Sequence, residues 1–125
     1  MLSPIQLDPL YVGDGAELRL TLTADGAVYD LTGCRVGFAM RPKTATTGAT
    51  ITKKNAACVG GSASQIEMTS PTTGVATILI DSTDTAALAT GRYEWDVVVE
   101  PADQRERTVA YGTIFVVERV TPALA

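Results

Sequence analysis

Apolar and polar residues alternate along several stretches of this 125-residue chain, with the period of two that predicts β-strands. In residues 16–24 three leucines alternate with charged residues and threonines, which places the leucines on one buried face. These leucines are Leu18, Leu20 and Leu22. Asp25-Gly26 follows directly and favours a tight turn. A second alternating stretch, residues 35–41, is expected to point Phe38 into the core.

A nearly apolar strand and a helical corner follow in the middle of the chain. Residues 75–80 contain Ile78 and only one polar side chain, which is typical of a central strand covered on both faces. The sequence DSTD at residues 81–84 offers side-chain oxygens to the first N–H groups of a helix, so we expect one short helical turn at residues 84–89, with Leu88 pointing inward. Calcium is the alternative ligand for these oxygens. It needs roughly six to eight of them, and the sequence has no DxDxDG-type loop, so capping is the favoured interpretation.

The penultimate strand carries the large aromatic side chains. Tyr93, Trp95 and Val97 alternate with charged residues and are expected to face inward. A tyrosine just after a helical corner is typical of the tyrosine corner of immunoglobulin-like domains, where the phenol bonds back to the preceding backbone. Trp95 stands where an antibody domain has its second cysteine, so no disulfide between sheets is expected. The two aromatic side chains could instead line a sugar pocket, but their inward spacing favours core packing.

These patterns predict an all-β fold, an immunoglobulin-like β-sandwich of roughly 7–9 antiparallel strands, as one domain over residues 1–125. A short edge strand is expected within residues 3–7 and a long last strand over residues 107–120, where Gly112 indicates a bulge or a close backbone approach. The predicted core consists of Leu18, Leu20, Leu22, Phe38, Ile78, Leu88, Tyr93, Trp95 and Val97.

Residues 42–64 differ from the rest in composition. They are rich in Thr, Ala, Gly and Ser, with few large apolar side chains to offset the entropy of ordering them. We therefore expect a flexible, exposed hairpin arm. Two interpretations stay open: a variable surface loop, or an arm that contacts a neighbouring subunit.

Composition limits the location of the protein. No apolar run approaches the roughly 20 residues that span a bilayer, so no membrane partner is expected. The N-terminus has no basic region followed by an apolar core, which favours assembly in the cytoplasm over export with a signal peptide. In a reducing compartment Cys34 and Cys58 are expected to stay free.

The charge balance argues against nucleic acid as a partner. The chain carries 14 acidic and 10 basic residues, a net charge of −4, whereas nonspecific nucleic-acid binding depends on many Lys and Arg contacts. Four basic residues could gather at one end of a hairpin, but no aromatic side chains interleave with them as stacking platforms. These residues are Arg41, Lys43, Lys53 and Lys54.

The sequence also lacks the groups of the common catalytic sites. It contains no histidine, which excludes Ser-His-Asp and Cys-His arrangements. No phosphate-binding glycine motif follows a strand, and the two cysteines lack zinc-site spacing. We expect no catalytic residue, no metal, no cofactor and no small-molecule substrate.

Four segments resemble the immunoglobulin-like N-terminal domains of bacteriophage baseplate upper proteins and related phage tail proteins. They are the DLTG turn at residues 30–33, the GVATILI strand, the DTAALATGRYEWDV corner and the closing GTIFV strand. The resemblance covers most of the chain. It implies a non-enzymatic component of a phage or prophage virion, located in a tail, baseplate or neck, that binds other phage structural proteins and forms a homo-oligomer.

Symmetric assembly could cover the open sheet edges of such a domain. Besides the arm, the candidate interface includes the N-terminal segment 3–12 and an edge near the end of the last strand. The candidate interface residues are Lys43, Lys53, Lys54, Ile114 and Val116.

A carbohydrate-binding or adhesive immunoglobulin-like module is the alternative function. It would need exposed aromatic side chains, and the sequence leaves open on which side of the sheets Tyr11, Tyr29 and Tyr111 lie. The fold alone does not separate the two functions, because β-sandwiches host both.

Overall fold

A computed structural model describes residues 4–24, 26–44, 50–102, 105–122 and 124. The chain forms eleven strands, one short α-helix and one 3₁₀ turn in the described part. The strands are β1 (Ile5–Gln6), β2 (Leu10–Tyr11), β3 (Ala16–Thr21), β4 (Thr23–Ala24), β5 (Ala27–Val28), β6 (Arg35–Pro42), β7 (Ile51–Lys54), β8 (Ile66–Glu67), β9 (Val75–Ile80), β10 (Gly91–Glu100) and β11 (Arg107–Val117). The helix α1 spans Ser82–Ala86, and the 3₁₀ turn η1 spans Pro71–Thr73.

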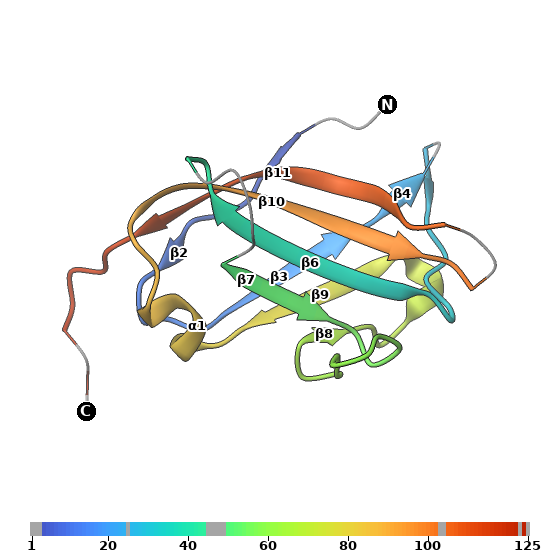
Figure 1. The fold of residues 1–125 in the computed structure, drawn as a ribbon, viewed down its shortest axis with the longest axis horizontal. Coiled ribbons are helices and arrows are strands. Elements are labelled where there is room, and N and C mark those ends of the chain that lie inside the picture. Colours follow the sequence, from blue (N-terminus) through green and yellow to red (C-terminus); the bar gives the residue numbers. More distant parts are fainter. Residues whose placement is uncertain (1–3, 25, 45–49, 103–104, 123, 125) are drawn as a thin grey trace.

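Two sheets form two layers (Figure 1). The larger sheet has the order β1-β11-β10-β6-β7, with β2 also paired to β11, and the smaller has the order β3-β9-β8. The short strands β4 and β5 form a separate hairpin beside them. The predicted all-β class is therefore confirmed.

One hydrophobic core lies between the two sheets. The alternation seen in the sequence places every second side chain of β3, β6, β9, β10 and β11 in it. All the residues predicted for the core are buried: Leu18, Leu20, Leu22, Phe38, Ile78, Leu88, Tyr93, Trp95 and Val97.

The N-terminal edge strand exists, but it corrects the expectation of a wholly antiparallel arrangement. Both β1 and β2 run parallel to β11. Ile5 pairs with Gly112, and the backbone of Ile5 lies where a side chain at residue 112 would begin. The predicted close backbone approach at Gly112 is therefore confirmed, and the glycine is what lets β1 lie beside β11.

Residues 51–55 correct the expectation of an exposed arm over residues 42–64. They form β7 and the residue after it, and β7 pairs with β6 at the edge of the larger sheet. Ile51, Lys53 and Asn55 are buried there, alternating with exposed residues. A strand within residues 49–53 is compatible with the sequence, but its burial is not apparent there because the strand is short and one of its inward residues is a lysine. Residues 45–49 of the expected arm lie outside the described residues.

The helical turn begins at Ser82 rather than at residue 84 and ends at Ala86. Its position follows from Asp84, which stands at the third helical position and accepts the Asp81 N–H through Oδ2 at 2.8 Å. The predicted capping role of these aspartates is confirmed, because Asp81 before the turn and Asp84 inside it form a reciprocal capping box. The turn therefore starts earlier than a cap at residue 84 would have placed it.

A bulge in β11 re-aims its side chains. The register between β10 and β11 shifts between Val97 and Val98, and Val109 and Ala110 are both buried although they are adjacent. Beyond the bulge, Tyr111 and the alternate residues that follow it point to the outer face of the larger sheet.

Candidate interaction surface

The aromatic side chains of β10, Tyr93 and Trp95, are buried in the core. The Tyr93 hydroxyl donates to the Ala89 carbonyl at 2.8 Å, which is the bond expected of a tyrosine corner. Trp95 donates its Nε1–H to the Thr113 carbonyl at 3.1 Å and stacks on Phe38, with ring centroids 6.2 Å apart. Burial raises the pKa of the Tyr93 phenol above its usual range, which keeps it protonated as a donor.

The structure corrects the placement of two of the predicted interface residues, Ile114 and Val116. Ile114 and Val116 are 0% and 1% exposed on the inner face of β11, so their side chains cannot contact a neighbour. The apolar end of the last strand looked like an exposed edge in the sequence, but β1 and β2 cover that side of β11.

The four basic residues that could gather at one end of a hairpin are not all exposed. Lys53 points inward, with 8% of its side chain exposed, and its Nζ lies 2.7 Å from Asp84 Oδ2. Lys43 lies 3.7 Å from Glu94 with a largely exposed side chain, and Lys54 is exposed at the edge strand. Lys53 is therefore removed from the candidate interface, because its charge is used within the fold.

Both cysteines are free. Cys34 is buried, whereas Cys58 is half-buried and donates its S–H toward Asn55 Oδ1 at 3.3 Å. Asn55 itself is buried and accepts the Val36 N–H at 3.1 Å while donating to the Cys34 carbonyl at 2.9 Å. This network fixes the start of β6 against the end of β7.

The outer face of the larger sheet is the surface that sequence reasoning missed. Four residues of β10 point outward, each opposite a residue of β6, in the pairs Glu94–Arg41, Asp96–Ala39, Val98–Gly37 and Glu100–Arg35. Both ends of this row are ion pairs, at 3.0 Å for Arg41 Nε–Glu94 Oε1 and 2.9 Å for Arg35 Nη1–Glu100 Oε1. Between the two ion pairs, the outward groups of β6 are only the methyl group of Ala39 and the hydrogen of Gly37, so the middle of the face is hollow.

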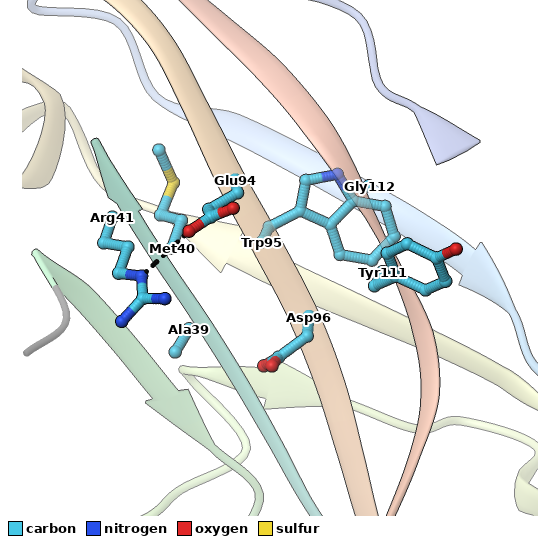
Figure 2. Close-up of a pocket in the computed structure, with 8 residues that line it drawn as sticks. All are labelled: Ala39, Met40, Arg41, Glu94, Trp95, Asp96, Tyr111 and Gly112. Carbon is cyan, nitrogen blue, oxygen red and sulfur yellow. Dashed lines mark hydrogen bonds and ion pairs between the residues drawn. The ribbon is translucent and has the colours of Figure 1, made fainter. Parts of the chain in front are cut away.

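The hollow extends on both sides of Asp96. On one side a shallow depression of about 350 Å³ is lined by residues of β6, β10 and β11 (Figure 2). These residues are Ala39, Met40, Arg41, Glu94, Trp95, Asp96, Tyr111 and Gly112. On the other side a second depression of about 420 Å³ shares Ala39 and Asp96 and extends past Val98 to Cys58 and Val59.

The electrostatics of the face centre on Asp96. Its neighbours across the sheet are Ala39 and Tyr111, neither of which carries a positive charge. Burial raises the pKa of the Asp96 carboxyl, the Arg41 charge opposes that shift and the Glu94 charge adds to it. By contrast, the hydrogen bond from Arg41 lowers the pKa of Glu94. Burial therefore disfavours the charged form of Asp96, whereas the Arg41 hydrogen bond favours the charged form of Glu94.

Strand β11 carries two outward aromatic side chains, of which Tyr111 lines the first depression. Tyr111 and Phe115 lie on the outward side, 38% and 39% exposed. Of the tyrosines left open by the sequence, Tyr11 is also exposed, whereas Tyr29 packs partly against the core. The signal that could have found this surface is the alternation of small outward residues in β6, Gly37 and Ala39, beside outward aromatic residues four apart in β11.

The described residues hold no group of three or more His, Cys, Asp or Glu side chains that could bind a metal ion. Among the same residues, no helix combines the length and apolar character needed to cross a membrane. A scan against protein-family models finds no match, and a search of curated proteins finds no significant match.

Proposed function

We propose that the chain is an immunoglobulin-like β-sandwich. In immunoglobulin domains of the variable type, one sheet contains strands G, F, C and C′, and the other contains B, E and D. The orders β11-β10-β6-β7 and β3-β9-β8 correspond to these strands. The hydrogen bond from Tyr93 to Ala89 at the corner before β10 supports the same assignment.

On this fold, we propose a non-enzymatic structural component of a phage or prophage virion, located in a tail, baseplate or neck, that acts by protein–protein assembly. The observation that carries the assembly function is the outer face of the larger sheet, where two depressions meet at Ala39 and Asp96. Tyr111 lines the first depression and Gly37 the second. The virion location rests on the resemblance of the strand and corner segments to phage tail proteins.

The composition of this face fits a protein partner. Protein interfaces place aromatic and apolar groups at the centre and charged groups at the rim. Here the ion pairs Arg41–Glu94 and Arg35–Glu100 lie at the two ends of the row, and Val98 and the small residues of β6 lie between them. A partner side chain seated beside Asp96 would meet a carboxylate and the Tyr111 ring together, and because the face of an aromatic ring attracts cations, this suits a lysine or arginine.

Filling the hollow tests this function. Gly37 has room outward, because the nearest atom to an added Cβ is the Lys53 carbonyl oxygen at 3.9 Å, so Gly37→Thr is expected to fold. Mass spectrometry of purified phage particles should find the wild-type chain in a fixed ratio to other virion proteins and the Gly37→Thr chain strongly depleted. Thr77→Val on β9 is the matched control and should be incorporated normally.

Absence of the wild-type chain from purified particles would overturn the virion assignment. Normal incorporation of a folded Gly37→Thr chain would leave the virion assignment in place and remove this face as the docking surface.

Carbohydrate binding is the second candidate function, because Tyr111 lies beside a depression that also contains Glu94 and Asp96. An aromatic ring with nearby carboxylates is a plausible platform for a sugar, whose apolar face stacks while its hydroxyls donate. Glycan-array binding that Tyr111→Ala abolishes and Tyr11→Ala preserves would favour this function over protein assembly.

A further inference from the structure

Strand β3 forms an open edge of the smaller sheet. It pairs with β9 on one side, and no strand of the described residues pairs with its other side (Figure 1). The Leu22 N–H donates to the Gly74 carbonyl at 2.7 Å in the register that continues along β3 and β9. Because alternate residues of an antiparallel pair bond to each other, the peptide groups of Glu17, Arg19 and Thr21 point to the open side.

The other edges of the two sheets are shorter or covered. At β7 the Lys54 N–H donates to Gln65 Oε1 at 3.0 Å, and the Lys54 carbonyl accepts the Ser62 N–H at 3.2 Å. The edge strands β1, β2 and β8 have two residues each. Strand β3, with six residues, is therefore the longest open edge in the described part of the chain.

The charges of β3 select a partner and a register. An antiparallel strand added at this edge must form its hydrogen bonds with the peptide groups of Glu17, Arg19 and Thr21. If the added strand is a second copy of β3, a two-fold axis at Leu18 places Glu17 opposite the partner's Arg19 and, by symmetry, Arg19 opposite the partner's Glu17. Shifting the axis to residue 17 or 19 instead sets like charges opposite each other, which is unfavourable.

We propose that two copies of this chain dimerise by antiparallel pairing of their β3 edges, with the two-fold axis at Leu18. The smaller sheets then join into one continuous sheet, and two cross-strand ion pairs lie on its outer face. On the inner face the two Leu18 side chains meet. Leu18 is 8% exposed, the largest exposed fraction among the core residues of the described chain, so pairing would complete its burial.

The proposal of this dimer rests on the proposed assembly function and specifies one partner for it, a second copy of the chain. The surface involved is separate from the outer face of the larger sheet. Sedimentation equilibrium of the purified chain over a wide range of concentrations is expected to show a monomer–dimer equilibrium. Glu17→Arg or Arg19→Glu alone turns both cross-strand pairs into like-charge pairs and should raise the dissociation constant roughly tenfold.

The double variant E17R/R19E restores opposite charges across the same register and should return the dissociation constant to within about threefold of the wild type. Circular dichroism verifies that each variant is folded, which is expected because both side chains are exposed. A wild-type chain that stays monomeric, single variants that dimerise unchanged, or a double variant that does not recover would each overturn the dimer. None of these results bears on incorporation of the chain into particles.

Discussion

The ammonium group of Lys53 lies 2.7 Å from Asp84 Oδ2 and joins the edge strand β7 to helix α1. The same carboxylate oxygen accepts the Asp81 N–H at 2.8 Å, so Asp84 fixes the helical turn and the edge strand at once. The lysine is more buried than the aspartate. Removing the Asp84 carboxylate therefore leaves a buried ammonium group, whereas removing Lys53 leaves a carboxylate that is partly exposed to solvent.

Asp84→Asn should destabilise the fold more than Lys53→Met. Replacing the aspartate leaves a buried ammonium without its counter-charge and should cost about 2–3 kcal/mol in free energy of unfolding. Replacing the lysine leaves a carboxylate that still reaches solvent and the Asp81 N–H, and should cost less than about 1 kcal/mol. Urea denaturation at pH 7 measures both values, and equal losses would contradict the asymmetry.

The same pair predicts a dependence of stability on acid. Burial acts to raise the pKa of Asp84, but the hydrogen bonds from Lys53 and Asp81 and the Lys53 charge lower it overall, below the ordinary value of 3.8. The unfolded state then binds the proton more readily, so the contribution of Asp84 is present above that value and is lost as pH falls through the folded pKa. The stability difference between wild type and Asp84→Asn should therefore shrink as pH falls from 6 toward about 2.5.

Asp96→Asn should show the opposite dependence. Because burial raises the pKa of Asp96 in the folded state, the folded protein holds the proton more tightly and loses stability as pH rises through the titration of this group. Above that range the asparagine variant should be at least as stable as wild type, with a gain of up to about 1 kcal/mol. A destabilised variant at pH 7 would show that Asp96 has a stabilising partner within the fold.

The two cysteines should differ sharply in reactivity. Burial raises the pKa of the Cys34 thiol, and the nearby Asp30 charge raises it further, so little reactive thiolate is present. Cys58 is only half-buried at the rim of the second depression. Iodoacetamide at pH 8 should therefore label Cys58 in the folded protein, and Cys34 only after unfolding in urea. Labelling of both sites at one rate by peptide mass spectrometry would contradict this.

The core could be read from the sequence because strand alternation depends on local spacing. Leu18, Phe38, Ile78 and Trp95 each lie in a stretch whose period of two specifies the buried face. The polar contacts between distant segments could not be read in this way. Lys53 looked like a surface charge because its partner, Asp84, is brought close only when β7 packs near α1.

The candidate surface was missed for a related reason. Whether a small residue such as Gly37 leaves a hollow depends on its neighbours across the sheet. Those neighbours follow from the pairing of β6 with β10, which the sequence does not show. The outward position of Tyr111 depends on the bulge at Val109, whose exact place in the strand the sequence does not specify. The glycine at 112 was informative because a glycine within a strand indicates a bulge or a close backbone approach whatever its partner is.

Tyr93→Phe should measure the corner hydrogen bond. The substitution keeps the buried ring and removes only the hydroxyl that donates to the Ala89 carbonyl, so a loss of about 1–2 kcal/mol in free energy of unfolding is expected. Tyr11→Phe, at an exposed tyrosine, is the control and should change stability by less than about 0.5 kcal/mol. Equal effects of the two variants would show that the corner bond contributes nothing.

Gly112→Ala should detach β1 from β11. An added methyl group would overlap the Ile5 backbone, so β1 must move away, at a cost of about 1–3 kcal/mol. Gly37→Ala is the matched control in β6. Its Cβ meets nothing closer than 3.9 Å, so it should be neutral or slightly stabilising.

A shortened chain separates this explanation from general strain in β11. In a variant that begins at Leu7, β1 is absent, and the contact between Ile5 and residue 112 is lost with it. Gly112→Ala should then cost less than about 0.5 kcal/mol, because the methyl group has no backbone to displace. Thermal or urea unfolding of the four proteins completes the double-mutant cycle. An equal cost of the alanine in both chain lengths would place the strain within β11 or against β10 and would remove β1 as the reason for the glycine.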